Sequence, residues 1–200
     1  LISLSASASA MLISGRYSIP ETDLLYSIEF PVTFEVVSTE MRDYDPSATL
    51  HKIDPQIATD LLKDSGMIMA AYAETSLGMN VCIEKVEGES FSAQDASEEE
   101  LKDWALSLAE AYYETHDGLY PALDGDLGSV YYSERLKYVC WQFFWFDEEL
   151  NDYRLSEHYA LFEPDYMLDI TFMYKMDDDE KFGEALDMSS YILNSVIRHK

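Results

Sequence analysis

Tyr26-Ser-Ile-Glu-Phe-Pro31 is the stretch of this chain that says most about its fold. It is typical of a β-strand that a proline closes, because proline cannot donate to a strand ladder and is found at strand ends. Gly15 to Pro20 precedes it as a similar signal, and Thr33 to Val37 follows it. Residues 15 to 37 are therefore predicted to form strands separated by prolines and an acidic turn.

The size and composition indicate a globular chain with enough apolar material for a packed core. The chain has 200 residues, of which 48% are hydrophobic and 14% aromatic. This is the size of one domain, which we place over residues 15–200. No stretch approaches the roughly 18 to 20 unbroken apolar residues that a bilayer-spanning helix needs. The sequence therefore predicts no membrane insertion of the mature chain.

The charge is strongly acidic and excludes some classes of partner. Thirteen basic residues against 39 acidic ones give a formal net charge of −26. Nucleic acid is excluded because its binding depends on neutralising phosphates with Lys and Arg. An anionic membrane surface is disfavoured for the same reason. The acidic residues are interpreted as a solvated surface, and an unidentified protein or small molecule is left as the partner.

The first fourteen residues resemble a leader rather than part of the fold. An apolar start, Leu1 to Leu4, is followed by small residues that include Ala8-Ser9-Ala10. Secretory signals end in such an Ala-x-Ala pattern after an apolar run. We interpret residues 1–14 as the remnant of a signal peptide, with a disordered leader as the alternative. The signal interpretation places the mature protein outside the cell, secreted or at the cell surface.

The middle of the chain alternates between helix and strand signals. Residues 40 to 53 are polar and are predicted to be irregular. Asp54-Pro55 then begins a helix, with Asp54 as its N-cap, and Gly66 ends it. The apolar stripe of this helix comprises Ile57, Ala58, Leu61 and Leu62. Residues 67–73 and 79–86 follow as a predicted hairpin.

The second half is predicted to contain two further helices around an antiparallel meander. Ser97 to Glu100 is a capping box that begins one helix, and Asp177 to Glu180 leads into the last one. Between them lie four strand signals joined by short links, at residues 128–133, 136–146, 153–162 and 166–175. The sequence therefore predicts an α+β fold with a central antiparallel sheet covered by helices on both faces.

The element order and a few residues resemble the PsbP-like family, which shares its fold with Mog-type Ran-binding proteins. Tyr26-Ser-Ile-Glu-Phe-Pro31 is similar to the family's Ser-Ile-x-Phe/Tyr-Pro strand, although Phe34 stands where Trp often follows. Ile192-Leu-Asn-Ser-Val196 is similar to the family's terminal Ile-x-x-Ser-Ile/Val pattern. The exported branch from Gram-positive bacteria is the most similar. The resemblance implies the fold, and an accessory or binding role only by analogy.

Motifs for nucleophilic or metal-dependent catalysis are missing from the sequence. There is no Gly-x-Ser-x-Gly elbow, and no paired histidines occur at metal-binding spacing. We interpret His51, His116, His158 and His199 as surface or helix-end residues. Cys82 and Cys140 lie in strand-like runs. We predict that they are two partly buried thiols, and a single disulfide between them is the alternative.

Two small groups of residues are the candidate binding sites. Asp124 and Asp126 flank a glycine and can present oxygens to Ca²⁺, but the calcium-loop pattern then fails at Gly128 and Arg135. An ordinary Asp/Gly turn is the preferred interpretation. Tyr131 and Tyr132 are predicted to form an exposed aromatic patch. In contrast, Trp141 and its aromatic neighbours alternate over both faces of one strand, which is typical of core packing.

These observations favour a non-catalytic, exported accessory or binding domain that needs no cofactor. Two alternatives remain. The first is a carboxylate-based hydrolase acting on glycans, which would need a facing pair of acidic residues in a pocket. The second is a calcium-responsive module based on Asp124 and Asp126.

Overall fold

The computed structural model describes residues 14–73, 77–88, 92–115, 120–121, 128–133, 135–147 and 151–199. Its helices are α1 (Pro46–His51), α2 (Pro55–Asp64), α3 (Glu98–Thr115) and α4 (Asp179–Ser195). Its strands are β1 (Ser14–Ser18), β2 (Tyr26–Pro31), β3 (Glu35–Ser38), β4 (Met67–Tyr72), β5 (Met79–Glu87), β6 (Tyr120–Pro121), β7 (Gly128–Tyr132), β8 (Lys137–Asp147), β9 (Asp152–Glu163), β10 (Tyr166–Lys175) and β11 (Ile197–Arg198).

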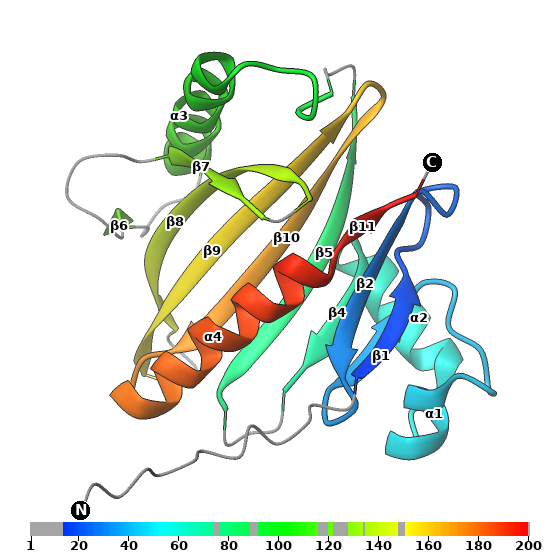
Figure 1. Cartoon of the computed structure of the whole chain (residues 1–200). Coiled ribbons are helices and arrows are strands. Elements are labelled where there is room, and N and C mark those ends of the chain that lie inside the picture. Colours follow the sequence, from blue (N-terminus) through cyan, green and yellow to red (C-terminus); the bar gives the residue numbers. More distant parts are fainter. Residues whose placement is uncertain are drawn as a thin grey trace, which may run out of the picture.

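The described strands form two antiparallel sheets, and the larger one, with eight strands, forms the centre of the fold (Figure 1). Its strand order is β3-β4-β5-β10-β9-β8-β6, and β7 pairs with β8 beside β6. The predicted hairpin is confirmed, because β4 and β5 pair directly. The predicted meander is confirmed as well, because β7, β8, β9 and β10 pair in chain order.

The stretch that resembles the PsbP-like family forms a separate small sheet. Its strand, β2, lies between β1 and β11. The chain then turns after Pro31, where the Phe34 amide donates to the Pro31 carbonyl over 3.0 Å, and β3 joins the large sheet. The central sheet therefore does not include β2. The two-residue strand β11 could not be foreseen, because its two pairs with β2 depend on where α4 ends.

Helices cover both faces of the large sheet, as the sequence predicted. Alternate residues of a strand point to opposite faces. The face that carries Ile170 and Phe172 packs against α4 and the small sheet. The opposite face carries Trp141 and Phe143, which pack against α3, and at its β3–β4 edge it packs against α2. Trp141 and Phe143 are buried, which confirms their predicted place in the core.

The predicted helix caps are present. The Asp54 carboxylate accepts from the Gln56 amide at the start of α2 over 2.9 Å. The Ser97 amide donates to the Glu100 carboxylate, and the Glu100 amide donates back to the Ser97 hydroxyl. At α4, the Asp178 carboxylate caps the first turn. Each cap satisfies amide groups that a helix leaves without an internal partner.

The prediction that residues 40–53 are irregular was wrong, because α1 occupies part of this stretch. Six residues are too few to show a helical period in the sequence. A long-range contact fixes the helix, since the Ser47 hydroxyl accepts from the Val36 amide over 2.7 Å. Ala48 is buried against the sheet beside it.

Candidate ligand-binding pocket

The two ends of α4 meet the large sheet in different ways. At the C-terminal end, the small sheet and the last residues of the chain pack onto the hairpin between β9 and β10 (Figure 1). We call this the closed end. At the N-terminal end, where Met176 links β10 to α4, a pocket lies beside the start of β9. We call this the open end.

A buried carboxylate holds the closed end together. The side chain of Glu163 is only 4% exposed and accepts two hydrogen bonds from Arg198, from Nε over 2.7 Å and from Nη2 over 3.0 Å. The Tyr26 hydroxyl donates to the same carboxylate. Burial alone would raise the pKa of Glu163, but the hydrogen bonds and the charge of Arg198 outweigh it and hold the pKa below its usual range. Glu163 is therefore fully paired and structural.

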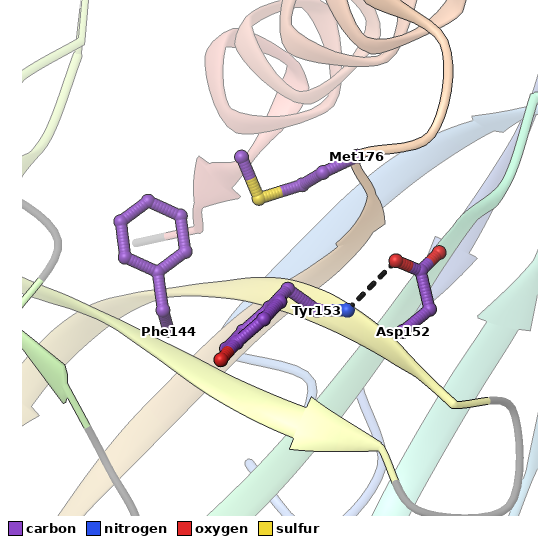
Figure 2. Close-up of a pocket in the computed structure, with 4 residues that line it drawn as sticks. All are labelled: Phe144, Asp152, Tyr153 and Met176. Carbon is purple, nitrogen blue, oxygen red and sulfur yellow. Dashed lines mark hydrogen bonds between the residues drawn. The ribbon is translucent and has the colours of Figure 1, made fainter.

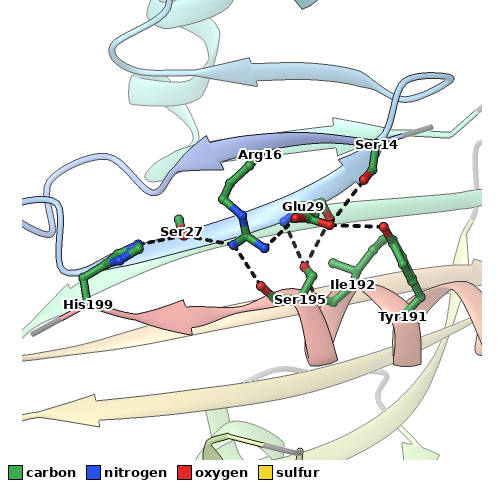
Figure 3. Close-up of polar contacts among 8 residues, drawn as sticks. All are labelled: Ser14, Arg16, Ser27, Glu29, Tyr191, Ile192, Ser195 and His199. Carbon is green, nitrogen blue, oxygen red and sulfur yellow. Dashed lines mark hydrogen bonds and ion pairs between the residues drawn. The ribbon is translucent and has the colours of Figure 1, made fainter. Parts of the chain in front are cut away.

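Ser195 connects the end of α4 to β2 (Figure 3). Its hydroxyl accepts from the Glu29 amide over 2.8 Å and donates to the Ile192 carbonyl over 2.6 Å. Arg16 on β1 donates to the Ser195 carbonyl over 3.1 Å and pairs with the Glu29 carboxylate over 2.5 Å. The serine of the C-terminal motif and the strand of the N-terminal motif thus make one contact, which gives the two quoted patterns a shared structural cause.

The open end contains a pocket of about 470 Å³ whose described lining residues are Phe144, Asp152, Tyr153 and Met176 (Figure 2). Phe144 comes from β8, Asp152 and Tyr153 from the start of β9, and Met176 from the link to α4. The Tyr153 side chain is 52% exposed, and Phe144 and Met176 are half-buried. The Asp152 carboxylate accepts from the Tyr153 amide over 2.8 Å. The lining thus combines two aromatic rings, a thioether and one carboxylate.

A second buried carboxylate, Glu157, lies deeper on the same face of β9. It is four residues beyond Tyr153, about 13 Å along the strand. It accepts from the Tyr174 hydroxyl over 2.7 Å, from the side-chain amide of Gln142 over 2.8 Å and from the Tyr159 hydroxyl over 3.4 Å. Burial raises the pKa of Glu157, although the tyrosine hydrogen bonds partly offset the shift. Three donors occupy this carboxylate, so it belongs to the core.

The structure separates the two tyrosines that the sequence placed together. Tyr131 is half-buried and packs against Tyr138 and Tyr159, with ring centroids 6.1 and 5.4 Å apart. Tyr132 is 50% exposed and hydrogen-bonds with Glu98 at the start of α3. Neighbouring residues of β7 point to opposite faces, so the pair forms no joint patch. A binding role for either residue stays a prediction.

The predicted calcium ligands, Asp124 and Asp126, lie outside the residues that the structure describes. Within the described ranges, no group of three His, Cys, Asp or Glu side chains is arranged to hold a metal ion. A calcium response therefore stays a prediction of the sequence. No helix in the described part of the chain is long and apolar enough to cross a membrane.

Both cysteines are buried and free, as predicted. Burial raises the pKa of the Cys82 thiol to about 12, and the pKa of Cys140 is raised for the same reason. The Cys140 sulfur also lies 3.0 Å from the Ser129 hydroxyl. Neither thiol is disposed to react at neutral pH, because the thiolate is the nucleophilic form.

The interpretation of His158 as a surface residue was wrong. Its ring is buried in β9, stacked on Trp141 with centroids 4.9 Å apart and 9° between the planes. Nδ1 lies 2.6 Å from the Asp169 carboxylate and 3.0 Å from the Thr171 hydroxyl. No local pattern indicates this environment, because Asp169 and Thr171 lie on β10 and come close to His158 only through the register of β9 and β10.

Comparison with known proteins shows a shared fold at low sequence identity. No family model matches the chain, and no curated protein matches it. Among solved structures, the cyanobacterial PsbP protein (CyanoP) of Synechocystis has a TM-score of 0.51 at 10% identity, covering 98% of both chains. A Bacteroides thetaiotaomicron protein has a TM-score of 0.51 at 9% identity, covering 92% of this chain.

This chain spans only 48% of the Bacteroides protein, about half its length. Mycobacterium tuberculosis LpqN, described as involved in cell envelope biogenesis, gives a TM-score of 0.48 at 9% identity, covering 92% of this chain and 83% of LpqN. At these identities the likeness concerns the fold alone. The α+β, PsbP-like architecture is confirmed, and the pocket at the open end has to be interpreted from its own residues.

Proposed function

We propose that the protein is an exported, non-catalytic binding domain and that its ligand occupies the pocket at the open end. The observation that carries the proposal is the pocket itself. Its volume of about 470 Å³ is that of a small-molecule site, and its described lining is aromatic and apolar with one carboxylate. Half-exposed aromatic side chains around a concave site are typical of ligand contacts.

The lining also indicates the class of ligand. Phe144, Tyr153 and Met176 suit an apolar or aromatic body, and thioether sulfur packs well against rings. Asp152 supplies a negative charge, in a protein whose net charge is −26. The pocket is therefore expected to favour a hydrophobic amine over neutral or acidic compounds of the same shape.

A glycan hydrolase is less well supported by this pocket. Acid–base cleavage of a glycosidic bond needs two carboxyl groups on either side of that bond. Among the described lining residues Asp152 is the one carboxylate, and the donors around Glu157 already occupy that buried group. Export is part of the proposal on the basis of the small-residue pattern at Ala8-Ser9-Ala10.

Isothermal titration with three compounds of one shape tests the proposal. Phenylbutylamine, phenylbutanol and phenylbutyrate share the same body and differ in charge. We expect the amine to bind most tightly and the carboxylate most weakly. Tyr153→Ser should weaken binding of the amine about tenfold, because it removes an aromatic side chain from the wall of the pocket. Asp152→Asn should reduce the preference for the amine over the alcohol.

Tyr132→Ser is the matched control, since Tyr132 has a similar exposure and lies on the other face of the sheet, beside α3. It should leave the affinity unchanged. Equal affinity for all three compounds, or loss of binding in Tyr132→Ser with full binding in Tyr153→Ser, would contradict the assignment of the pocket.

A further inference from the structure

Only part of the apolar stripe of helix α2 is buried against the sheet. The sequence places Ile57, Ala58, Leu61 and Leu62 on one stripe. In the structure Ala58 and Leu62 are buried, whereas Ile57 is 59% exposed and Leu61 is 65% exposed. Two large aliphatic side chains one helical turn apart therefore form an exposed ridge along α2. A pair of this kind, next to a groove, is typical of an interaction surface.

The ridge forms one wall of a groove of about 300 Å³ between α2 and the β3–β4 edge of the large sheet. Exposed Tyr72 on β4 lies on the sheet side, and Met67 and Val37 contribute further apolar surface. The groove lies on the face of the sheet opposite α4, so it is separate from the pocket at the open end.

Carboxylates line the same groove. Glu35 on β3 and Asp54 at the start of α2 are both lining residues. Glu35 has 55% of its side chain exposed and lies 3.7 Å from His51. Asp60 and Asp64 are exposed on α2, next to the ridge. The groove thus combines an apolar floor with a negative rim, on a protein of net charge −26.

We infer that this groove binds a basic amphipathic helix of a partner protein. Apolar side chains of such a helix would pack on Ile57, Leu61 and Tyr72, and its Lys or Arg residues would face Glu35 and Asp54. Charge complementarity selects this occupant, because a second copy of this chain would bring a second strongly negative surface to the groove. The inference is independent of the proposed function.

Fluorescence anisotropy with a labelled lysine–leucine peptide, patterned as an amphipathic helix, tests the inference on the full chain. We expect binding at physiological salt and at least tenfold weaker binding of a peptide with the same composition in shuffled order. Leu61→Gln should weaken binding about tenfold, because it removes an exposed apolar contact. Glu35→Gln should weaken binding less, and mainly at low salt.

Two control substitutions distinguish binding in the groove from nonspecific hydrophobic or electrostatic binding of the peptide. Leu50→Gln removes an equally exposed leucine from α1, and Glu99→Gln removes an exposed carboxylate from α3. Both should bind like the native protein. Equal binding of the shuffled peptide, no binding of either peptide, or loss of binding in the two control variants would overturn the inference. So would concentration-dependent dimers that Leu61→Gln abolishes, since they would make a second copy the occupant.

Discussion

The two ends of α4 show how one fold can separate stability from binding. At the closed end, the Glu163 carboxylate is buried and accepts hydrogen bonds from Arg198 and Tyr26. At the open end, Phe144, Tyr153 and Met176 are only partly covered and surround a pocket. Fully paired polar groups and buried rings stabilise a fold, whereas half-covered aromatic surface is available to a ligand.

The comparison also explains where the family-like residues lie. Both patterns that resemble the PsbP-like family, in β2 and at the end of α4, belong to the closed end. They specify how the small sheet attaches to the large one. The residues of the open end match no such pattern, so a shared fold does not imply a shared ligand.

The largest effect is expected from Arg198→Ala, which breaks the ion pair of the closed end. The variant leaves Glu163 buried without its cation, and breaking a fully buried pair costs about 3–5 kcal/mol. Because Arg198 is itself 38% exposed, we expect a loss of about 2–3 kcal/mol in the free energy of unfolding. Urea denaturation measures it. Arg135→Ala, at an exposed turn, is the control, and equal losses in both variants would contradict a structural role for the pair.

Ser195→Ala should have the next largest effect. It removes the hydroxyl that accepts from the Glu29 amide and donates to the Ile192 carbonyl. Leaving a fully buried amide without an acceptor costs about 1–3 kcal/mol, and because this contact is only partly buried we expect a loss near the lower limit. Thermal denaturation is the measurement. Ser190→Ala, on the exposed side of α4, should be neutral, and a neutral Ser195→Ala would show that the link between β2 and α4 contributes little.

A smaller effect is expected in the pH dependence of stability, to which Glu163 and Glu157 contribute in opposite directions. The folded-state pKa of Glu163 is lowered. Its contribution to the stability of the fold is therefore present above the usual glutamate pKa and is lost as pH falls through the folded pKa. The pKa of Glu157 is raised by burial. Its contribution to the stability of the fold is therefore greatest at low pH and is lost as pH rises through the folded pKa.

Denaturation from pH 7 down to acidic pH should therefore separate two conservative variants. As pH falls, the stability advantage of the native protein over Glu163→Gln should shrink. Over the same range its stability relative to Glu157→Gln should increase. Parallel pH profiles for the two variants would show that the two carboxylates do not differ in the way their contacts indicate.

Tyr153→Ser should leave stability nearly unchanged, within about 0.5 kcal/mol, because the side chain is 52% exposed. The same variant should weaken binding of a hydrophobic amine about tenfold. A large loss of stability in this variant would place the open end in the structural part of the fold and remove the contrast between the two ends.

Calcium should have the smallest effect. The Asp124 and Asp126 pattern departs from a calcium loop at two positions, so millimolar CaCl₂ is expected to leave the thermal midpoint unchanged. An increase in the midpoint that Asp124→Asn abolishes would revive the calcium-responsive alternative.

The regular elements could be predicted because their signals are local. Asp54, Ser97 and Asp178 mark helix starts within a few residues, and the Trp141 run is apolar on both sides. The separate small sheet, α1 and the burial of His158 depend on contacts between distant residues. The pocket combines residues from β8, β9 and the link to α4. These segments are separate in the sequence, so no short pattern predicts the pocket.

Methionine methyl NMR gives the most direct test of the distinction between the two ends. Among the nine methionines, Met176 lines the pocket, whereas Met69 and Met79 are buried in the core. Titration with phenylbutylamine should shift the Met176 methyl signal in a saturable way and leave those of Met69 and Met79 in place. Saturable shifts at Met69 and Met79, with an unmoved Met176, would contradict ligand binding at the open end.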